Sequence, residues 1–153
     1  MVRIEFHRNE TNGSIRGFTV CGHAGAGSRG NDIVCAAVSA LTQACVLGLQ
    51  RVLQLPGEAE WRQGWLSCRY DGGGTSPAAG LPVAADSRDA DSPDTERREF
   101  AAQVLFRTLF VALSDLAATH PQHVQVTWAP PGSTGCGGRT KPEVPHASLD
   151  QGE

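Results

Sequence analysis

A helix-length stretch without a charged residue, from Ile33 to Gln50, most constrains how this chain can fold. It reaches the minimal length of a transmembrane helix, but Thr42 and Gln43 lie inside it, so we expect no membrane span. A helix that carries no charge on any side is typical of one that protein covers on most sides. We therefore predict a buried helix from residue 33 to about 54. A chain of 153 residues offers little to cover every side, which favours a second subunit.

Alternating polar and apolar residues predict strands on both sides of this helix. "VRIEFHR" (2–8) alternates with period two, an Asn-Gly pair at 12–13 marks a tight turn, and "IRGFTVC" (15–21) follows as the returning strand. A second hairpin is predicted over 59–70. Its packing residues are Trp61, Trp65 and Leu66.

A second helix is predicted from about Thr95 to Thr119, followed by a short strand at 123–128. The resulting order is β-β-α-β-β-α-β. Because most strands are joined by hairpins, we expect an α+β fold with a largely antiparallel sheet and two helices packed on it. One face of the second helix carries apolar residues at helical spacing, namely Leu105, Leu109, Ala112 and Leu116.

Two segments differ in composition from the rest of the chain. Residues 71–94 consist mainly of Gly, Ala, Ser, Pro and Asp, which bury too little apolar surface to offset the entropy of ordering them. Residues 129–153 are again rich in Pro, Gly and polar side chains. We predict a single domain over 1–128, with a flexible insertion at 71–94 and a disordered tail at 129–153.

The charge of the chain excludes one common class of partner. The net charge is −3 and Lys141 is the sole lysine, so there is no clustered basic footprint for direct binding of nucleic acid. The first ten residues, "MVRIEFHRNE", contain no apolar core of a secretory signal. We therefore expect a cytoplasmic protein.

A glycine-rich loop precedes the first helix and matches a dinucleotide-binding pattern. "GAGSRG" (25–30) fits G-x-G-x-x-G and lies between a predicted strand and a helix. However, no acidic residue follows near position 50, and the fold has no repeated β-α-β crossovers. A Gly-Lys-Ser/Thr phosphate loop is also missing from the sequence. These points favour a mobile loop over a nucleotide site.

Cys35 and His23 form the strongest candidate for chemistry. Cys35 falls in the first turn of the helix if Asn31 or Asp32 caps it, and a helix N-terminus favours a thiolate, whereas the charge of Asp32 opposes it. The end of the strand and the start of the helix meet at one sheet edge, so the loop can bring His23 to the sulfur. Such a pair predicts a cysteine hydrolase, with the Cys35 N–H as an oxyanion donor. Ser39 follows one helical turn later.

Less specific interpretations of these residues remain open. A cysteine near a helix start is often a packed core residue, and a loop histidine is often only solvated. Zinc is a further alternative, since Cys21, His23 and Cys35 are possible ligands, although no C-x₂-C pair is present.

"GHAG" (22–25) and "GNDIVCAAVSAL" (30–41) resemble the signature of the ribosomal-processing cysteine proteases, the Prp family. The resemblance extends to the opening hairpin, to the strand at 65–70, and to the second predicted helix with the strand after it. It covers residues 1–70 and about 94–128.

This resemblance implies a homodimer of small α+β subunits that needs no metal or cofactor. It implies that Cys35 is the nucleophile and that His23 is its general base and later the proton donor. It also implies that the glycine-rich loop orders over the substrate. Residues implied to bind substrate or to support the site are Gly22, Gly25, Gly30, Asp32 and Ser39.

The implied reaction is removal of a short N-terminal extension from a large-subunit ribosomal protein, the twenty-seventh, after a pair of aromatic residues. The partner is then the precursor of that ribosomal protein, and the reaction supports ribosome assembly. The alternative is a non-catalytic binding factor in ribosome assembly.

Overall fold

The computed structural model describes residues 1–28, 30–70 and 93–131. Most of the predicted insertion and tail therefore lies outside the described residues. The sequence places Pro93 and Asp94 in the insertion, but in the structure they begin the second helix. The elements are β1 (Val2–Arg8), β2 (Ile15–Cys21), α1 (Ile33–Leu47), the π-helical turn η1 (Gly48–Val52), β3 (Glu58–Arg62), β4 (Trp65–Arg69), α2 (Pro93–Thr119) and β5 (Val124–Trp128).

The strands form one five-stranded sheet in the order β3-β4-β2-β1-β5. The pairs β1–β2, β2–β4 and β3–β4 are antiparallel, while β1 and β5 are parallel, with Val2 opposite Val124. The sheet is therefore mixed. Hairpin signals predict only pairs that are adjacent in sequence, whereas β5 reaches β1 after the long helix α2. The α+β class with two helices is confirmed.

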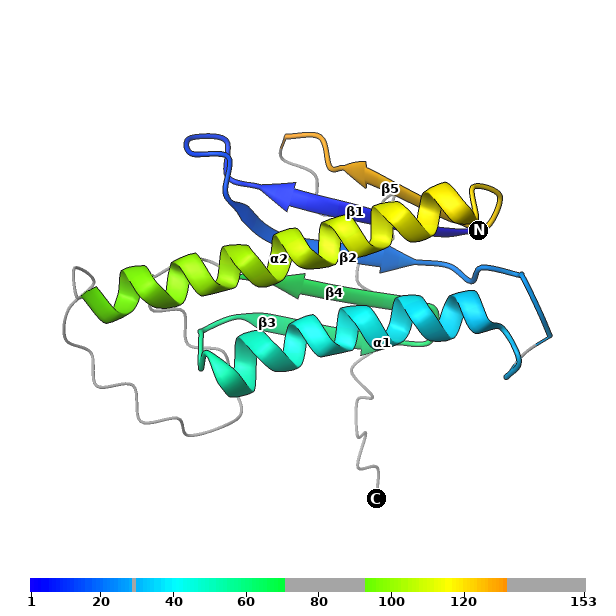
Figure 1. Cartoon of the computed structure of the whole chain (residues 1–153), viewed down its shortest axis with the longest axis horizontal. Helices are drawn as coiled ribbons and strands as arrows, with labels where there is room; N and C mark the ends of the chain where they lie inside the picture. Colours follow the sequence, from blue (N-terminus) through cyan, green and yellow to red (C-terminus); the bar gives the residue numbers. More distant parts are fainter. Residues whose placement is uncertain (29, 71–92, 132–153) are drawn as a thin grey trace, which may run out of the picture.

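Both helices lie across the same face of the sheet, α2 over the β1–β5 side and α1 over the β3–β4 side (Figure 1). The core forms between this helical layer and the sheet. Aromatic rings fill its centre, where Phe6 contacts Phe18 and Phe110, and Phe18 contacts Phe106. Period-two burial of β1 places Val2, Ile4 and Phe6 in this core.

Helix α1 buries one face rather than every side. Its buried residues recur every three or four positions, and Ile33 at its start is 76% exposed. The chain itself leaves the other sides of α1 uncovered, and their cover by a second subunit stays a prediction. Both α1 with η1 and α2 are long and apolar enough to cross a membrane by length and hydropathy, a property that core helices share. Here each packs on the sheet. The buried residues of α1 are Val34, Val38, Thr42, Cys45 and Val46.

The face of α2 that meets the core is rotated from the predicted one. Leu109 is buried as expected, but Leu105 and Leu116 lie at the margin of the core, partly buried. The other buried residues of this face are Ala102, Phe106 and Leu113. On the opposite side, an exposed apolar stripe consists of Phe100, Val104 and Val111.

Candidate active site

Asp32 caps the N-terminus of α1 and connects the helix to the glycine-rich loop. Its Oδ1 accepts a hydrogen bond from the Cys35 N–H at 2.9 Å, and its Oδ2 accepts one from the Ala26 N–H at 3.1 Å. The bond from the Cys35 amide is the main reason why the pKa of the Asp32 carboxyl is below its ordinary value. Of the two predicted capping residues, the helix therefore uses Asp32.

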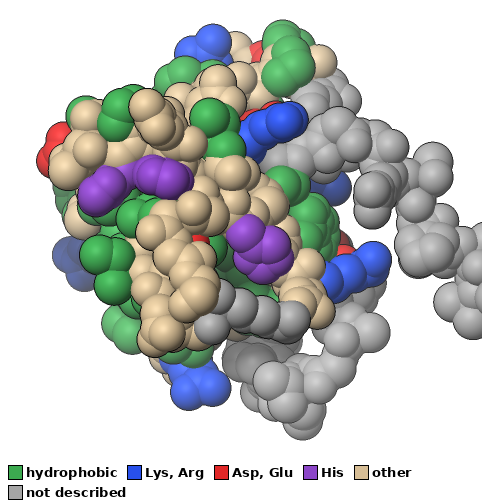
Figure 2. Space-filling view, turned by 90° about the vertical axis from the view of Figure 1, so that its right-hand side faces the viewer, with side chains coloured by type: hydrophobic (Ala, Val, Ile, Leu, Met, Phe, Trp, Pro, Cys, Tyr) green, Lys and Arg blue, Asp and Glu red, His purple; other side chains and the backbone are tan. Residues whose placement is uncertain are grey.

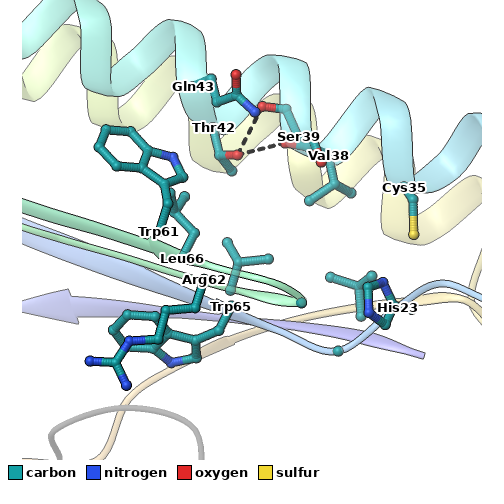
Figure 3. A pocket seen from close by; sticks show the side chains of 14 residues that line it. His23, Cys35, Val38, Ser39, Thr42, Gln43, Trp61, Arg62, Trp65 and Leu66 are labelled. Carbon is teal, nitrogen blue, oxygen red and sulfur yellow. Dashed lines mark hydrogen bonds between the residues drawn. The ribbon is translucent and has the colours of Figure 1, made fainter.

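Cys35 lies in the first turn of α1, where its side chain points from the helix toward the segment that carries His23 (Figure 3). The Ala24 N–H donates a hydrogen bond to its Sγ at 3.0 Å. The N–H of Cys35 itself is bonded to Asp32, so its expected role as an oxyanion donor is not available in this arrangement. The amide that faces the sulfur belongs to Ala24.

Two other free cysteines among the described residues are unsuited to nucleophilic chemistry. Cys45 and Cys68 are buried in the core, and burial raises the pKa of each thiol to about 12. Cys35, in contrast, is half-buried and lines a cleft. Because the thiolate is the reactive form, Cys35 is the candidate nucleophile among these three.

His23 follows the end of β2 and rests against the β3–β4 turn. The Gly22 N–H donates to the Gly64 carbonyl at 2.8 Å, which ties the two segments together. A Cβ at Gly64 would come within 2.8 Å of the His23 Nε2, so the ring occupies the space that glycine leaves. His23 and Cys35 line the same cleft, although no hydrogen bond between their side chains is found in the described part of the chain.

The cleft lies between α1 and the β3–β4 hairpin and has a volume of about 180 Å³. Trp61, which is 50% exposed, lies on the side that faces α1, and Trp65 lies lower, with the Arg62 guanidinium 5.5 Å from its ring centroid (Figure 3). The sequence identified these tryptophans as packing residues and missed their place in the site. The available signal was two large aromatic residues in a short hairpin. What was lacking was the pairing that sets this hairpin beside β2.

The predicted supporting residues divide into two groups. Gly22 and Ser39 line the cleft together with His23 and Cys35. Gly25, Gly30 and the cap Asp32 are outside its lining, and the two glycines have positive φ angles of 65° and 90°. Such angles favour glycine and give the loop its sharp turns.

The zinc alternative has no geometric support among the described residues. Within residues 1–28, 30–70 and 93–131, no three His, Cys, Asp or Glu side chains gather closely enough to hold a metal ion. Cys21, His23 and Cys35 therefore do not form such a cluster.

The chain matches a family model described as cysteine protease Prp over residues 1–125. Two similar solved structures are of the essential ribosomal processing protease Prp from S. aureus, one with a covalently linked product peptide and one with a substrate peptide. Both are 18% identical in sequence, with TM-scores of 0.61 and 0.60, and cover 84% of this chain and 100% of theirs.

A third similar structure is SMU.848 from Streptococcus mutans, which is 22% identical, has a TM-score of 0.53, and covers 84% of this chain and 93% of its own. At these identities the likeness concerns the fold. No curated protein matches the chain in sequence.

Proposed function

The chain belongs to the family of cysteine protease Prp, and on that premise we propose that it removes a short N-terminal extension from a large-subunit ribosomal protein, the twenty-seventh, after an aromatic pair. The observation that carries this proposal is the placement of Cys35. Its sulfur lies in the first turn of α1, accepts the Ala24 N–H, and faces a cleft that His23 also lines.

In the proposed reaction His23 takes the proton from the Cys35 Sγ, and the thiolate attacks the carbonyl carbon of the scissile bond. The protonated His23 then gives its proton to the leaving amine as the C–N bond breaks. Water, deprotonated by His23, releases the acyl group from the sulfur and regenerates the thiol. The Ala24 N–H lies beside the reacting sulfur, in a position from which it can also stabilise the oxyanion.

The lining of the cleft supports an aromatic preference in the substrate. Trp61, Trp65 and Leu66 present apolar surface along the cleft, with Trp61 near Thr42 and away from Cys35 (Figure 3), and aromatic rings pack favourably against one another in edge-to-face or offset arrangements. The glycine-rich loop, with Gly25 and Gly30 as its flexible points, is proposed to close over the bound peptide. Since ribosomal proteins are made in the cytoplasm, the proposal also places the enzyme there.

The decisive experiment is incubation of the purified chain with the host's own ribosomal protein, followed by measurement of the product mass. Cys35→Ala and His23→Ala should each lower the rate of cleavage by about a thousandfold or more, because nucleophile and base act as one unit. Cys45→Ala, which removes a buried thiol outside the cleft, should keep cleavage. Full activity in Cys35→Ala would contradict the proposal. Ribosome association without cleavage by the native chain would instead support the binding factor.

We also propose that the enzyme is a homodimer. The exposed stripe Phe100, Val104 and Val111 on α2, together with exposed Val52 in η1, leaves apolar surface on the helical layer. Exposed apolar side chains that share one face of a helix favour an association site. A second copy of the chain is the proposed occupant, with an interface in the obligate size class above about 2,000 Å².

A further inference from the structure

His123 contacts the loop that carries the candidate histidine, although the two are far apart in sequence. Its Nδ1 lies 2.9 Å from the carbonyl oxygen of Ala24, a residue 99 positions earlier. A carbonyl oxygen only accepts hydrogen bonds, so the Nδ1 of His123 must carry the hydrogen. Figure 2, which views the end of the molecule where α1 begins, shows histidine side chains at separate places on this face.

Ala24 connects this hydrogen bond to the reacting sulfur. Its carbonyl accepts from His123, and its N–H donates to the Cys35 Sγ at 3.0 Å. Ala24 is only 3% exposed, so water does not replace either bond easily. Two dihedral angles alone separate the N–H and the C=O of one residue, so holding the carbonyl restricts the direction of the N–H.

The backbone around His123 is itself fixed by the sheet. The Val2 N–H donates to the His123 carbonyl at 2.8 Å, and the His123 N–H donates to the His120 carbonyl at 2.9 Å. The parallel pairing of β1 with β5 begins at the next residue, where Val124 lies opposite Val2. The ring therefore projects from a rigid corner toward the loop.

We propose that His123 is a positioning residue of the active site: it holds Ala24 so that the Ala24 N–H points at the Cys35 sulfur and stabilises the thiolate. A hydrogen bond to a charged sulfur is stronger than one to a neutral thiol, so this donor favours the reactive form. The proposal rests on the proposed function only in taking Cys35 as the nucleophile. It assigns to the α2–β5 turn a role that the cleft lining does not reveal.

The test compares His123→Leu with His123→Asn, two side chains of the same shape. The Asn amide can place an N–H near the position of Nδ1 and donate to Ala24, whereas Leu cannot. Alkylation of Cys35 by iodoacetamide at pH 7 is followed by peptide mass spectrometry, and kcat and KM are measured with an aromatic-terminated peptide. We expect His123→Leu to lower the alkylation rate and kcat by about 10- to 100-fold with little change in KM. His123→Asn should recover most of both rates.

Two further variants make the result decisive. His120→Leu removes another histidine from the same turn and should behave as the native enzyme. If His123→Leu does not fold, His123→Ala takes its place in the same comparison with His123→Asn. Equal rates in the Leu and Asn variants, or a native alkylation rate in His123→Leu, would overturn the proposal. Alkylation needs no protease activity, so this result is separate from the Cys35→Ala cleavage test of the proposed function.

Discussion

Gly64 occupies the turn between β3 and β4 at the point where the His23 ring packs against it. Its φ of +69° is in the left-handed region, and an added Cβ would lie 2.8 Å from the His23 Nε2. We predict that Gly64→Ala displaces the His23 ring and lowers kcat by about tenfold or more, because small misplacements of a catalytic group are costly. The backbone strain should also reduce the free energy of unfolding by about 1–2 kcal/mol.

Gly13 provides the matched control for this substitution. It lies in the β1–β2 turn with a φ of +68°, and an added Cβ there meets nothing within 4 Å. Gly13→Ala should therefore lose similar stability in a denaturant titration and keep the native kcat. If both variants lose activity to the same degree, the contact between Gly64 and His23 has no special role.

At the level of single residues, the sequence predicted some site residues and missed others for a physical reason. His23 and Cys35 are recognisable because they belong to one continuous motif, and Asp32 because a capping residue acts within a few positions. Trp61 and His123 reach the site only through the sheet. For Trp61 this is the pairing of β3 with β4 and of β4 with β2, and for His123 it is the pairing of β5 with β1. Their contribution depends on partners that are distant in sequence.

Among the elements, α1 depends on its Asp32 cap in a way that pH can reveal. The carboxyl has a lowered pKa in the folded state, so its stabilising effect is present above the ordinary value of 3.8 and is lost as pH falls through the lower folded value. Asn caps helices about as well as Asp but does not titrate. We predict that the native chain is more stable than Asp32→Asn at pH 7 and that this difference shrinks between about pH 4 and pH 2.

Thermal unfolding of the two proteins across this pH range measures the difference directly. The other carboxyl groups titrate in both proteins, so their contribution cancels. Asp32→Ala should be less stable than Asp32→Asn at every pH, since it has no side-chain acceptor for the Cys35 N–H. A difference between native chain and Asp32→Asn that stays constant down to pH 2 would contradict the prediction.

Local sequence patterns predicted the helices and strands themselves, but not the surfaces by which they pack on one another. Period-two alternation gave β1, and its burial in the structure matches that pattern. The absence of charge in 33–50 predicted a helix but not which of its faces the chain would bury, because composition alone does not tell one face from another. The rotated core face of α2 has the same origin, since apolar residues occur on both of its sides.

For the whole molecule, the exposed residues Phe100, Val104 and Val111 favour association of two copies. They lie on one stripe of α2, opposite the residues that pack on the sheet, where an apolar surface would otherwise face water. We predict a particle of about twice the chain mass of 16.2 kDa in sedimentation at micromolar concentration. Its melting temperature should rise with protein concentration, because a dimer is stabilised by mass action. The melting temperature of a monomer does not depend on its concentration.

Two substitutions by glutamate on α2 test where the second copy binds. Phe100→Glu combined with Val111→Glu should give a monomer, because burying two carboxylates in an apolar interface without partners is strongly unfavourable. Thr127→Glu adds a charge at an exposed position of β5, outside the stripe, and should leave the dimer intact. The melting temperature of the double variant should no longer depend on concentration. A native chain that sediments as a monomer would refute the dimer, whereas a double variant that stays dimeric would move the interface away from α2.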